Sequence, residues 1–348
     1  MRVALFSAAF CAALSLGASA ALAQATEDNV ASGGQFPLAA PAGQDSGARE
    51  KAPAGAVNQG AYDMTKWKYG PRYNPPAGGS QIWNPVKAKM MAGGKVTAGT
   101  VFFANTPQTY CAMANAGYDF IWTEMQHSPH TWQAVANMWA ACPHARAVPG
   151  VRVPNANEFD EQHALDEGAL VLVVPTIRSL AEGKEAAKWA FWPPMGQRSA
   201  GGGQAFTPEF WGNVPGGYRQ TFNDNLVLIL MIETLDGLKD ADKIAKIPGV
   251  SALFAASSDL GNFAGYRQGD PDYEREINIV HDAALKAHVR LCGPLAWRDR
   301  PDFTCFQAPT EDTAITLGVH QQLGDLWNTQ GKVSVGPYAN MPPPPRMH

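Results

Sequence analysis

The sequence predicts an α/β protein of the (β/α)8 barrel class, and three observations support this prediction. Short aliphatic runs alternate with segments of helical composition, which is typical of a parallel sheet covered by helices. One of these runs, Leu226–Thr234, opens with seven consecutive apolar residues, which indicates a strand buried on both faces. The alternation repeats near eight times, and this number favours a closed barrel over an open doubly wound sheet.

Each predicted strand is an aliphatic or aromatic run bounded by polar, glycine or proline residues. In order, the strands are Thr97–Phe103, Asp119–Glu124, Ala147–Val153, Leu170–Thr176, Leu226–Thr234, Ser251–Ala256, Val289–Pro294 and Val319–Leu323. Segments rich in good helix formers are expected to form the helices between them. These helices are Thr106–Ala116, Trp132–Ala141, Glu158–Glu167, Ala181–Ala190 and Leu238–Lys246, and Pro248–Gly249 stops the last of them.

The two ends of the chain differ in composition from this alternating part. Residues 1–23 have one basic residue, a short apolar core and a small-x-small site ending at Ala23, which is the pattern of a secretory signal peptide. Residues 24–80 and the proline-rich tail 332–348 lack apolar periodicity, so we expect a flexible leader and a short disordered tail around a barrel domain at 81–331. We therefore expect a periplasmic or secreted protein with no membrane anchor after cleavage.

Charge and cysteine content narrow the class of protein further. The formal net charge is −4, and it becomes −5 once the segment containing Arg2 is removed. This mild acidity, without a basic cluster, argues against a nucleic-acid partner. Cys111, Cys142, Cys292 and Cys305 remain, with no Cys-x-x-Cys pair, so a zinc–thiolate site is not expected. A disulfide between Cys292 and Cys305 and buried free thiols are both open alternatives.

Two carboxylates end neighbouring predicted strands. Glu233 closes the most apolar run, and Asp259 follows the next strand 26 residues later, about one strand–helix–strand unit. Adjacent parallel strands lie roughly 4.8 Å apart, so these two acids are predicted to share one divalent cation. Their oxygen donors favour Mg²⁺ or Mn²⁺, with Co²⁺ or Zn²⁺ as possible substitutes. The alternative is structural: Glu233 caps a helix and Asp259 closes a turn.

Three further polar residues lie near predicted strand ends. Arg152 offers fixed positive charge to a substrate carboxylate or a developing enolate. His127 suits general-base catalysis, and Glu124 is expected to orient it. Alternatives are a surface ion pair for Arg152 and structural packing for His127. Metal binding by His127 and His130 is disfavoured, because Pro129 disrupts helical spacing between them.

A long insertion separates the fourth predicted helix from the fifth strand. Its core, Trp192–Gln204, is too rich in glycine for regular structure, and it lacks the Gly-Lys-Ser/Thr of a phosphate-binding loop. Gly201–Gly203 allow close backbone approach to a ligand, although a surface loop is the simpler alternative. We expect the insertion to lie over the barrel mouth, with Arg198, Gln204 and the strand-end residue Ser258 binding substrate.

Five motifs in this order resemble the HpcH/HpaI aldolase / citrate lyase family. They are Glu124–His127, Val151–Pro154, Pro193–Arg198, Met231–Gly237 and Ser257–Gly261, and the likeness covers residues from about 95 to 325. The chain departs from the family pattern at three points: Met231 replaces a Gln, Glu124 replaces an Asp, and Ser257–Ser258 replaces Gly-Pro.

The resemblance implies a TIM barrel that cleaves a 4-hydroxy-2-oxoacid to pyruvate and an aldehyde through a metal-stabilised enolate. It implies Glu233 and Asp259 as metal ligands, Arg152 on the pyruvate moiety, and His127 with Glu124 as the base system. The expected partner is a small oxoacid, and a homo-oligomer is possible. Two other functions stay open: a citrate-lyase-like enzyme acting on a thioester, and a secreted barrel that binds an oxoacid without turnover.

Overall fold

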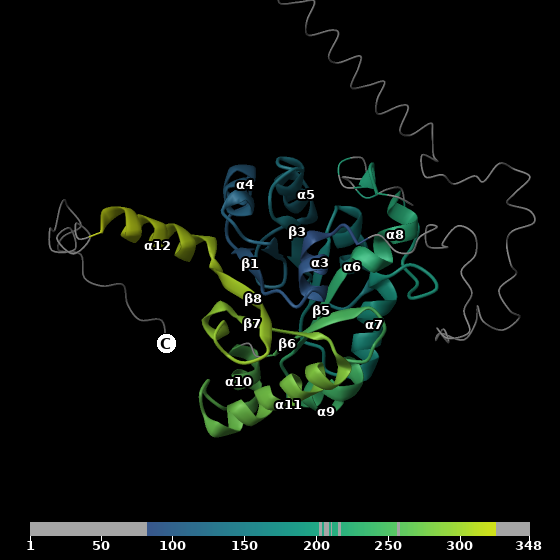
Figure 1. The fold of residues 1–348 in the computed structure, drawn as a ribbon, viewed down its shortest axis with the longest axis vertical. Coiled ribbons are helices and arrows are strands. Elements are labelled where there is room, and N and C mark those ends of the chain that lie inside the picture. The colour runs from purple at the N-terminus through teal and green to yellow at the C-terminus, as the bar shows by residue number, and fades with distance from the viewer. Residues whose placement is uncertain are drawn as a thin grey trace, which may run out of the picture.

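Eight parallel strands close into a barrel, as the sequence predicts (Figure 1). The computed structural model describes residues 82–324, except 202–203, 205–208, 210, 215–216 and 256–257. The expected signal peptide, leader and proline-rich tail lie outside the described residues. The strands are β1 Val96–Val101, β2 Phe120–Glu124, β3 Val148–Arg152, β4 Val171–Val174, β5 Val227–Ile232, β6 Val250–Ala255, β7 Arg290–Pro294 and β8 Phe303–Thr310.

Helices surround the barrel and follow most of the strands. They are α3 Pro85–Met91, α4 Pro107–Asn115, α5 Trp132–Ala140, α6 Glu158–Asp166, α7 Leu180–Ala190, α8 Gly217–Asn225, α9 Leu235–Ile244, α10 Ser258–Ala264, α11 Pro271–Ala287 and α12 Glu311–Leu323, with the 3-10 turn η3 Leu295–Trp297. The N-termini of α4, α5, α6, α7 and α9 are each capped by a Ser, Thr or Asn side chain that accepts a backbone N–H bond. No described helix has both the length and the apolar character needed to cross a membrane.

The most apolar predicted strand is the centre of the core. Every residue of β5 is buried, and the strand pairs with β4 and β6 in parallel register, Val171 with Val227 and Ile232 with Ala255. Alternate side chains therefore point into the barrel and toward the helices, and both environments are apolar. Residues inside the barrel fill it, so chemistry is confined to its ends.

The two ends of the barrel have different roles. Here the end where the strands finish is called the mouth, and the end where they begin is called the base. At the base, Asn84 donates to the Leu170 carbonyl, and Lys87 at the start of α3 donates to the Leu226 carbonyl and to Ser251 Oγ. Burial lowers the pKa of Lys87 to about 8. Helix α3 thus closes the base, and the mouth stays available for ligands.

The predicted eighth strand is wrong. Residues 319–323 belong to α12, and the last strand is β8, which pairs with β1 and β7. The sequence pattern did not indicate β8, because Pro309 lies near its end and proline is unusual inside a strand. Beyond its first turn α12 extends away from the barrel, and Ile315, Leu317 and Val319 on it are exposed (Figure 1).

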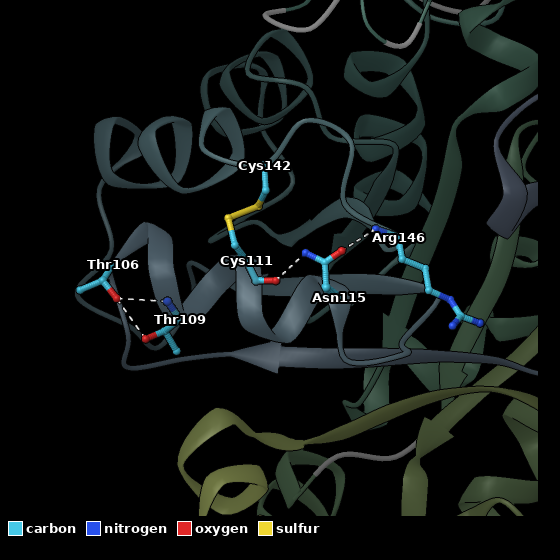
Figure 2. The surroundings of a disulfide bond; sticks show 6 residues. All are labelled: Thr106, Thr109, Cys111, Asn115, Cys142 and Arg146. Atoms are coloured by element: carbon cyan, nitrogen blue, oxygen red, sulfur yellow. Dashed lines mark hydrogen bonds between the residues drawn. A yellow bond between two sulfur atoms is a disulfide. The ribbon is translucent and has the colours of Figure 1, made fainter.

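Both cysteine pairs form disulfides. Cys292 and Cys305 sit at paired positions of β7 and β8, with their Cα atoms 4.2 Å apart, which settles the choice between bridge and thiols. The second bridge, Cys111–Cys142, was not anticipated; it joins α4 to the segment after α5 (Figure 2). Beside it, Asn115 accepts from the backbone N–H of Arg146 at 3.3 Å, a second link between the same segments.

Candidate active site at the mouth of the barrel

Glu124 is the most fully bonded side chain of the mouth. It ends β2, is fully buried, and accepts four hydrogen bonds. Its Oε1 accepts from the backbone N–H groups of Gln126 at 2.6 Å and His127 at 3.1 Å. Its Oε2 accepts from Arg152 Nε at 2.6 Å and Trp122 Nε1 at 3.2 Å. Such a set of donors fixes a carboxylate in one position.

Arg152 is placed by this carboxylate. It ends β3 opposite Glu124 in the strand register, and its guanidinium lies 5.6 Å from the ring centre of Trp122. The bond to Glu124 uses Nε, while Nη1 lies 3.9 Å from the sulfur of Met231 on β5. Nη1 therefore points toward β5 at Met231, two residues before Glu233, and the η nitrogens have no carboxylate partner in the described part of the chain, so they can bind an anionic group.

Glu233 lies directly after β5 and is held on one side only. Its Oε1 accepts from the backbone N–H of Thr176 at 2.8 Å and from the Thr176 hydroxyl at 3.0 Å. Its Oε2 is buried and has no hydrogen-bond partner. A buried carboxylate oxygen without a partner is costly unless a cation or a donor from a ligand meets it. This orphaned oxygen is the clearest ligand-directed feature of the site.

Thr176 was missed by the sequence prediction of the site. It follows β4 and has a φ of 53°, a conformation that costs energy in a β-branched residue and is common at functional sites. The next residue, Ile177, packs its carbonyl against Gly237, where an added Cβ would lie 2.2 Å from that oxygen. A glycine is thus required there, so that the segment carrying Thr176 can approach Glu233.

Asp259 lies in the first turn of α10, which follows the neighbouring strand β6. Because β5 and β6 are paired and parallel, Asp259 and Glu233 belong to the same end of the barrel. Asp259 is partly exposed, and Ser258 beside it is exposed. In the described part of the chain, no three His, Cys, Asp or Glu residues cluster to hold a metal. Two carboxylates with free positions for water and substrate still fit a hard divalent cation.

His127 is exposed on the loop after β2, also at the mouth. The expected contact between Glu124 and the imidazole is not what the structure has. Glu124 accepts from the backbone N–H of His127, because its remaining acceptor positions are used by Gln126, Trp122 and Arg152. Glu124 therefore holds the loop that carries His127, and the ring is free to turn toward a ligand.

The insertion lies at the base, contrary to the expectation that it covers the mouth. Arg198 Nη2 donates to Asp166 at 2.5 Å and to the Tyr218 hydroxyl at 2.9 Å. Gln204 Nε2 donates to the carbonyls of Leu165 and Ala169, and both residues lie where α6 ends and β4 is about to begin. A loop that follows a helix of the barrel reaches the end where the next strand starts. Arg198 and Gln204 are therefore placed away from Glu233, and they serve the packing of the insertion.

Comparison with known proteins finds relatives that are aldolases. A hydroxypyruvate/pyruvate aldolase of Roseovarius nubinhibens is 28% identical over 213 residues, which cover 61% of this chain and 80% of the relative. An aldolase of the same name from Paraburkholderia phytofirmans is 34% identical over 184 residues, 51% of this chain and 70% of the relative.

Solved structures share the fold. A crystal structure of a protein of the HpcH/HpaI aldolase/citrate lyase family from Burkholderia cenocepacia superposes with a TM-score of 0.62. It is 24% identical and covers 70% of this chain and 99% of its own. Residues 100–295, which contain Glu124, Arg152, Glu233 and Asp259, match the model of that family. The chain therefore belongs to the HpcH/HpaI aldolase/citrate lyase family.

Proposed function

We propose that this protein is a metal-dependent aldolase that cleaves a 4-hydroxy-2-oxoacid to pyruvate and an aldehyde. The observation that carries the proposal is the buried, unpartnered Oε2 of Glu233. Glu233 directly follows β5, the strand whose Met231 is contacted by Arg152 Nη1, so a cation-binding oxygen and an anion-binding group belong to the same part of the mouth. The names of the aldolase relatives support an oxoacid as the substrate class.

Glu233 and Asp259 would hold the cation. A divalent ion bound there would supply positive charge that polarises the 2-oxo group of the substrate. Thr176 fixes Oε1 of Glu233, which leaves Oε2 for this role.

Arg152 binds and orients the oxoacid. Its guanidinium suits the substrate carboxylate or the oxygen at C2, where negative charge develops as the carbon–carbon bond breaks. Glu124 keeps this guanidinium in place through Nε and so leaves the η nitrogens for the substrate. The guanidinium binds most strongly in the transition state, when negative charge has developed at the C2 oxygen. It therefore lowers the activation barrier and does not act on the Michaelis constant alone.

His127 is the proposed base. It takes the proton of the 4-hydroxyl group, the C3–C4 bond breaks, and the bonding pair moves toward the oxygen at C2 while the aldehyde leaves. C3 then takes a proton back from the protonated His127, directly or through water, to give pyruvate. The exposed position of the imidazole allows it to reach the hydroxyl directly or through one water.

The first prediction tests this function through Glu233→Gln, which keeps the shape of the side chain and removes its charge. We expect the parent to bind about one divalent cation per chain and to release pyruvate from at least one of a panel of 4-hydroxy-2-oxoacids. The variant should lose most of its bound metal, by elemental analysis, and its turnover should fall by at least about 100-fold. Its circular dichroism spectrum and thermal midpoint should stay close to those of the parent.

Asp236→Asn is the matched control, because Asp236 is exposed and lies three residues from Glu233, and the substitution removes the same charge. It should keep both metal and turnover. Full metal occupancy in Glu233→Gln, or undiminished turnover after exhaustive chelation of the parent, contradicts the proposal. Binding of an oxoacid without turnover would favour the non-catalytic barrel, and turnover of an acyl thioester would favour the citrate-lyase-like alternative.

We also infer that the protein is exported to the periplasm or beyond. The two disulfides support this, because such bonds persist in oxidising compartments and are rare in the cytosol. The signal-peptide pattern in the sequence points the same way.

A further inference from the structure

A third buried carboxylate at the mouth, besides Glu124 and Glu233, has no part in the proposed chemistry. Glu311 is the first residue of α12 and is 3% exposed. Its Oε2 accepts from the backbone N–H of Phe102 at 2.8 Å, and its Oε1 accepts from those of Phe103 and Ala104 at 2.6 Å each. One side chain thus satisfies three consecutive N–H groups of the segment that follows β1.

Residues 102–104 have no sheet or helix of their own to hold them. They lie between β1 and α4, where three successive N–H donors would otherwise need water. A carboxylate that accepts several backbone N–H bonds is a strong and specific anchor, because charge-assisted hydrogen bonds are about twice as strong as neutral ones. Glu311 therefore sets the position of this segment.

His130 continues the connection to the next strand. Its ring is buried, with Nε2 3.0 Å from the Ala104 carbonyl and Nδ1 2.8 Å from the Glu124 carbonyl. The same Glu124 carbonyl accepts from Ser128 Oγ at 2.5 Å. The imidazole thus bridges the segment held by Glu311 and the residue whose side chain places Arg152.

We propose that Glu311 and His130 are positioning residues that fix the β1 and β2 ends of the mouth relative to each other. The path runs from the start of α12 through residues 102–104 and the His130 ring to Glu124 and then Arg152. Because Glu311 begins the helix that extends away from the barrel, the same path couples the orientation of α12 to the site. The catalytic consequence rests on the proposed aldolase function, whereas the structural connection does not.

The second prediction compares Glu311→Gln with the matched control Asp312→Asn. A glutamine amide keeps one acceptor oxygen and places an NH2 group where the other oxygen accepted, so at least one of the three N–H bonds is lost. We expect backbone hydrogen exchange in a peptide covering 102–104 to become at least about tenfold faster in Glu311→Gln. Asp312 is exposed and neighbours Glu311, so its variant should exchange like the parent. Peptides from β5 should be unchanged in both.

Kinetics then separate positioning from a merely local structural role. In Glu311→Gln we expect kcat for oxoacid cleavage to fall roughly 10- to 100-fold, with the metal content retained, because small displacements of catalytic groups are costly. His130→Phe keeps a ring of similar size and removes both ring nitrogens, and it should give a similar loss. The double variant should lose little more than either single variant, because both side chains act on the same segment.

Several outcomes would overturn the proposal. Unchanged exchange at 102–104 in Glu311→Gln would show that the carboxylate does not hold the segment. Faster exchange with parental kcat would show that the segment is held but positions nothing, and additive losses in the double variant would show two independent effects. If the parent itself cleaves no oxoacid, the proposed function fails, while the exchange data still decide whether Glu311 is the anchor.

Discussion

At the scale of single residues, Glu161 on α6 is a buried acid that no ion pair or hydrogen bond compensates in the described part of the chain. It is fully buried, and neither carboxylate oxygen has a hydrogen-bond partner. Burial raises its pKa well above the ordinary value of 4.5, and the nearby charges of Glu185 and Asp160 add to this. The folded protein therefore binds this proton more tightly than the unfolded chain. Its stabilising effect is complete below pH 4.5 and is lost as pH rises through the raised pKa.

The third prediction follows from this sign. Glu161→Gln stays neutral at every pH, so it should match the parent near pH 4 and become progressively more stable than the parent as pH rises. The gain is about 1.4 kcal/mol for each unit by which the pKa is raised. Thermal or urea unfolding at several pH values measures it, with Glu158→Gln as an exposed control on the same helix. A pH-independent difference would mean that the pKa of Glu161 is the same in the folded and the unfolded protein.

Residue by residue, the sequence predicted which polar residues end the strands better than it predicted their contacts. Alternation placed Glu124, Arg152 and Glu233 at strand ends, and all three are at the mouth. It could not show that Glu124 bonds a backbone N–H in place of an imidazole, because that depends on how the loop after β2 folds back. The left-handed backbone of Thr176 has no sequence signal beyond its place after a buried strand.

At the scale of elements, the insertion between α7 and β5 is a structural attachment at the base. The Arg198 guanidinium is fully buried, bonds Asp166, and lies 5.0 Å from the ring centre of Trp192 and 4.7 Å from that of Phe222. Asp166 is partly exposed, so the ion pair alone contributes little net stability. The aromatic contacts and the Tyr218 bond make the arginine a tie between α6, the insertion and α8.

The fourth prediction is that Arg198→Ala lowers stability and leaves substrate binding alone. Loss of the buried guanidinium leaves a cavity among aromatic rings, so we expect a cost of about 2–4 kcal/mol in the free energy of unfolding. The Michaelis constant of the remaining folded enzyme should stay within about twofold of the parent. Arg178→Ala, at an exposed position, is the control and should change stability by less than about 0.5 kcal/mol. A raised Michaelis constant with an unchanged melting temperature would contradict this prediction and indicate that Arg198 binds substrate.

Chain order alone contained the information needed to place the insertion. It follows a helix and precedes a strand, and in a barrel of this class such connections lie at the base. The glycines and the arginine of the insertion suggested a ligand-binding loop. Composition does not show which end of the barrel a loop reaches, so the predicted position at the mouth was wrong. The prediction of the last strand was also wrong. Pro309 weakened the strand pattern of β8, and apolar residues of α12 were predicted to be the strand instead.

For the whole molecule, the repeated alternation of strands and helices made the barrel predictable. No such periodic pattern shows which cysteines form disulfide bonds between its elements. Seven of the eight predicted strands overlap observed ones, because buried parallel strands need continuous apolar runs. Cysteine pairing is different, because proximity in sequence suggested Cys292–Cys305 but not Cys111–Cys142. That second pair depends on how α4 and α5 lie side by side, which the sequence does not show.

The two disulfides differ in accessibility, and this sets up the last prediction. Cys292 and Cys305 are buried between paired strands, at 0% and 2% exposure, whereas Cys111 and Cys142 are each partly exposed. Thiol–disulfide exchange needs access to a sulfur atom. A mild reductant acting on the folded protein should therefore open Cys111–Cys142 first and spare Cys292–Cys305. Alkylation followed by peptide mass spectrometry identifies which cysteines react.

Opening Cys111–Cys142 should also lower the thermal midpoint, because this bridge closes a loop with a sequence separation of 31 residues and contributes about 3.7 kcal/mol. The double variant Cys111→Ser/Cys142→Ser should show the same lowered midpoint without reductant, and reductant should then have no further effect under native conditions. A variant that still loses stability in reductant would mean that the buried bridge is the one being opened.

Protein exported from the full chain should carry both bridges and begin at Gln24, whereas residues 24–348 made in a reducing cytosol should carry free thiols and melt lower. Equal midpoints and free thiols in both preparations would contradict export to an oxidising compartment as the source of the bridges.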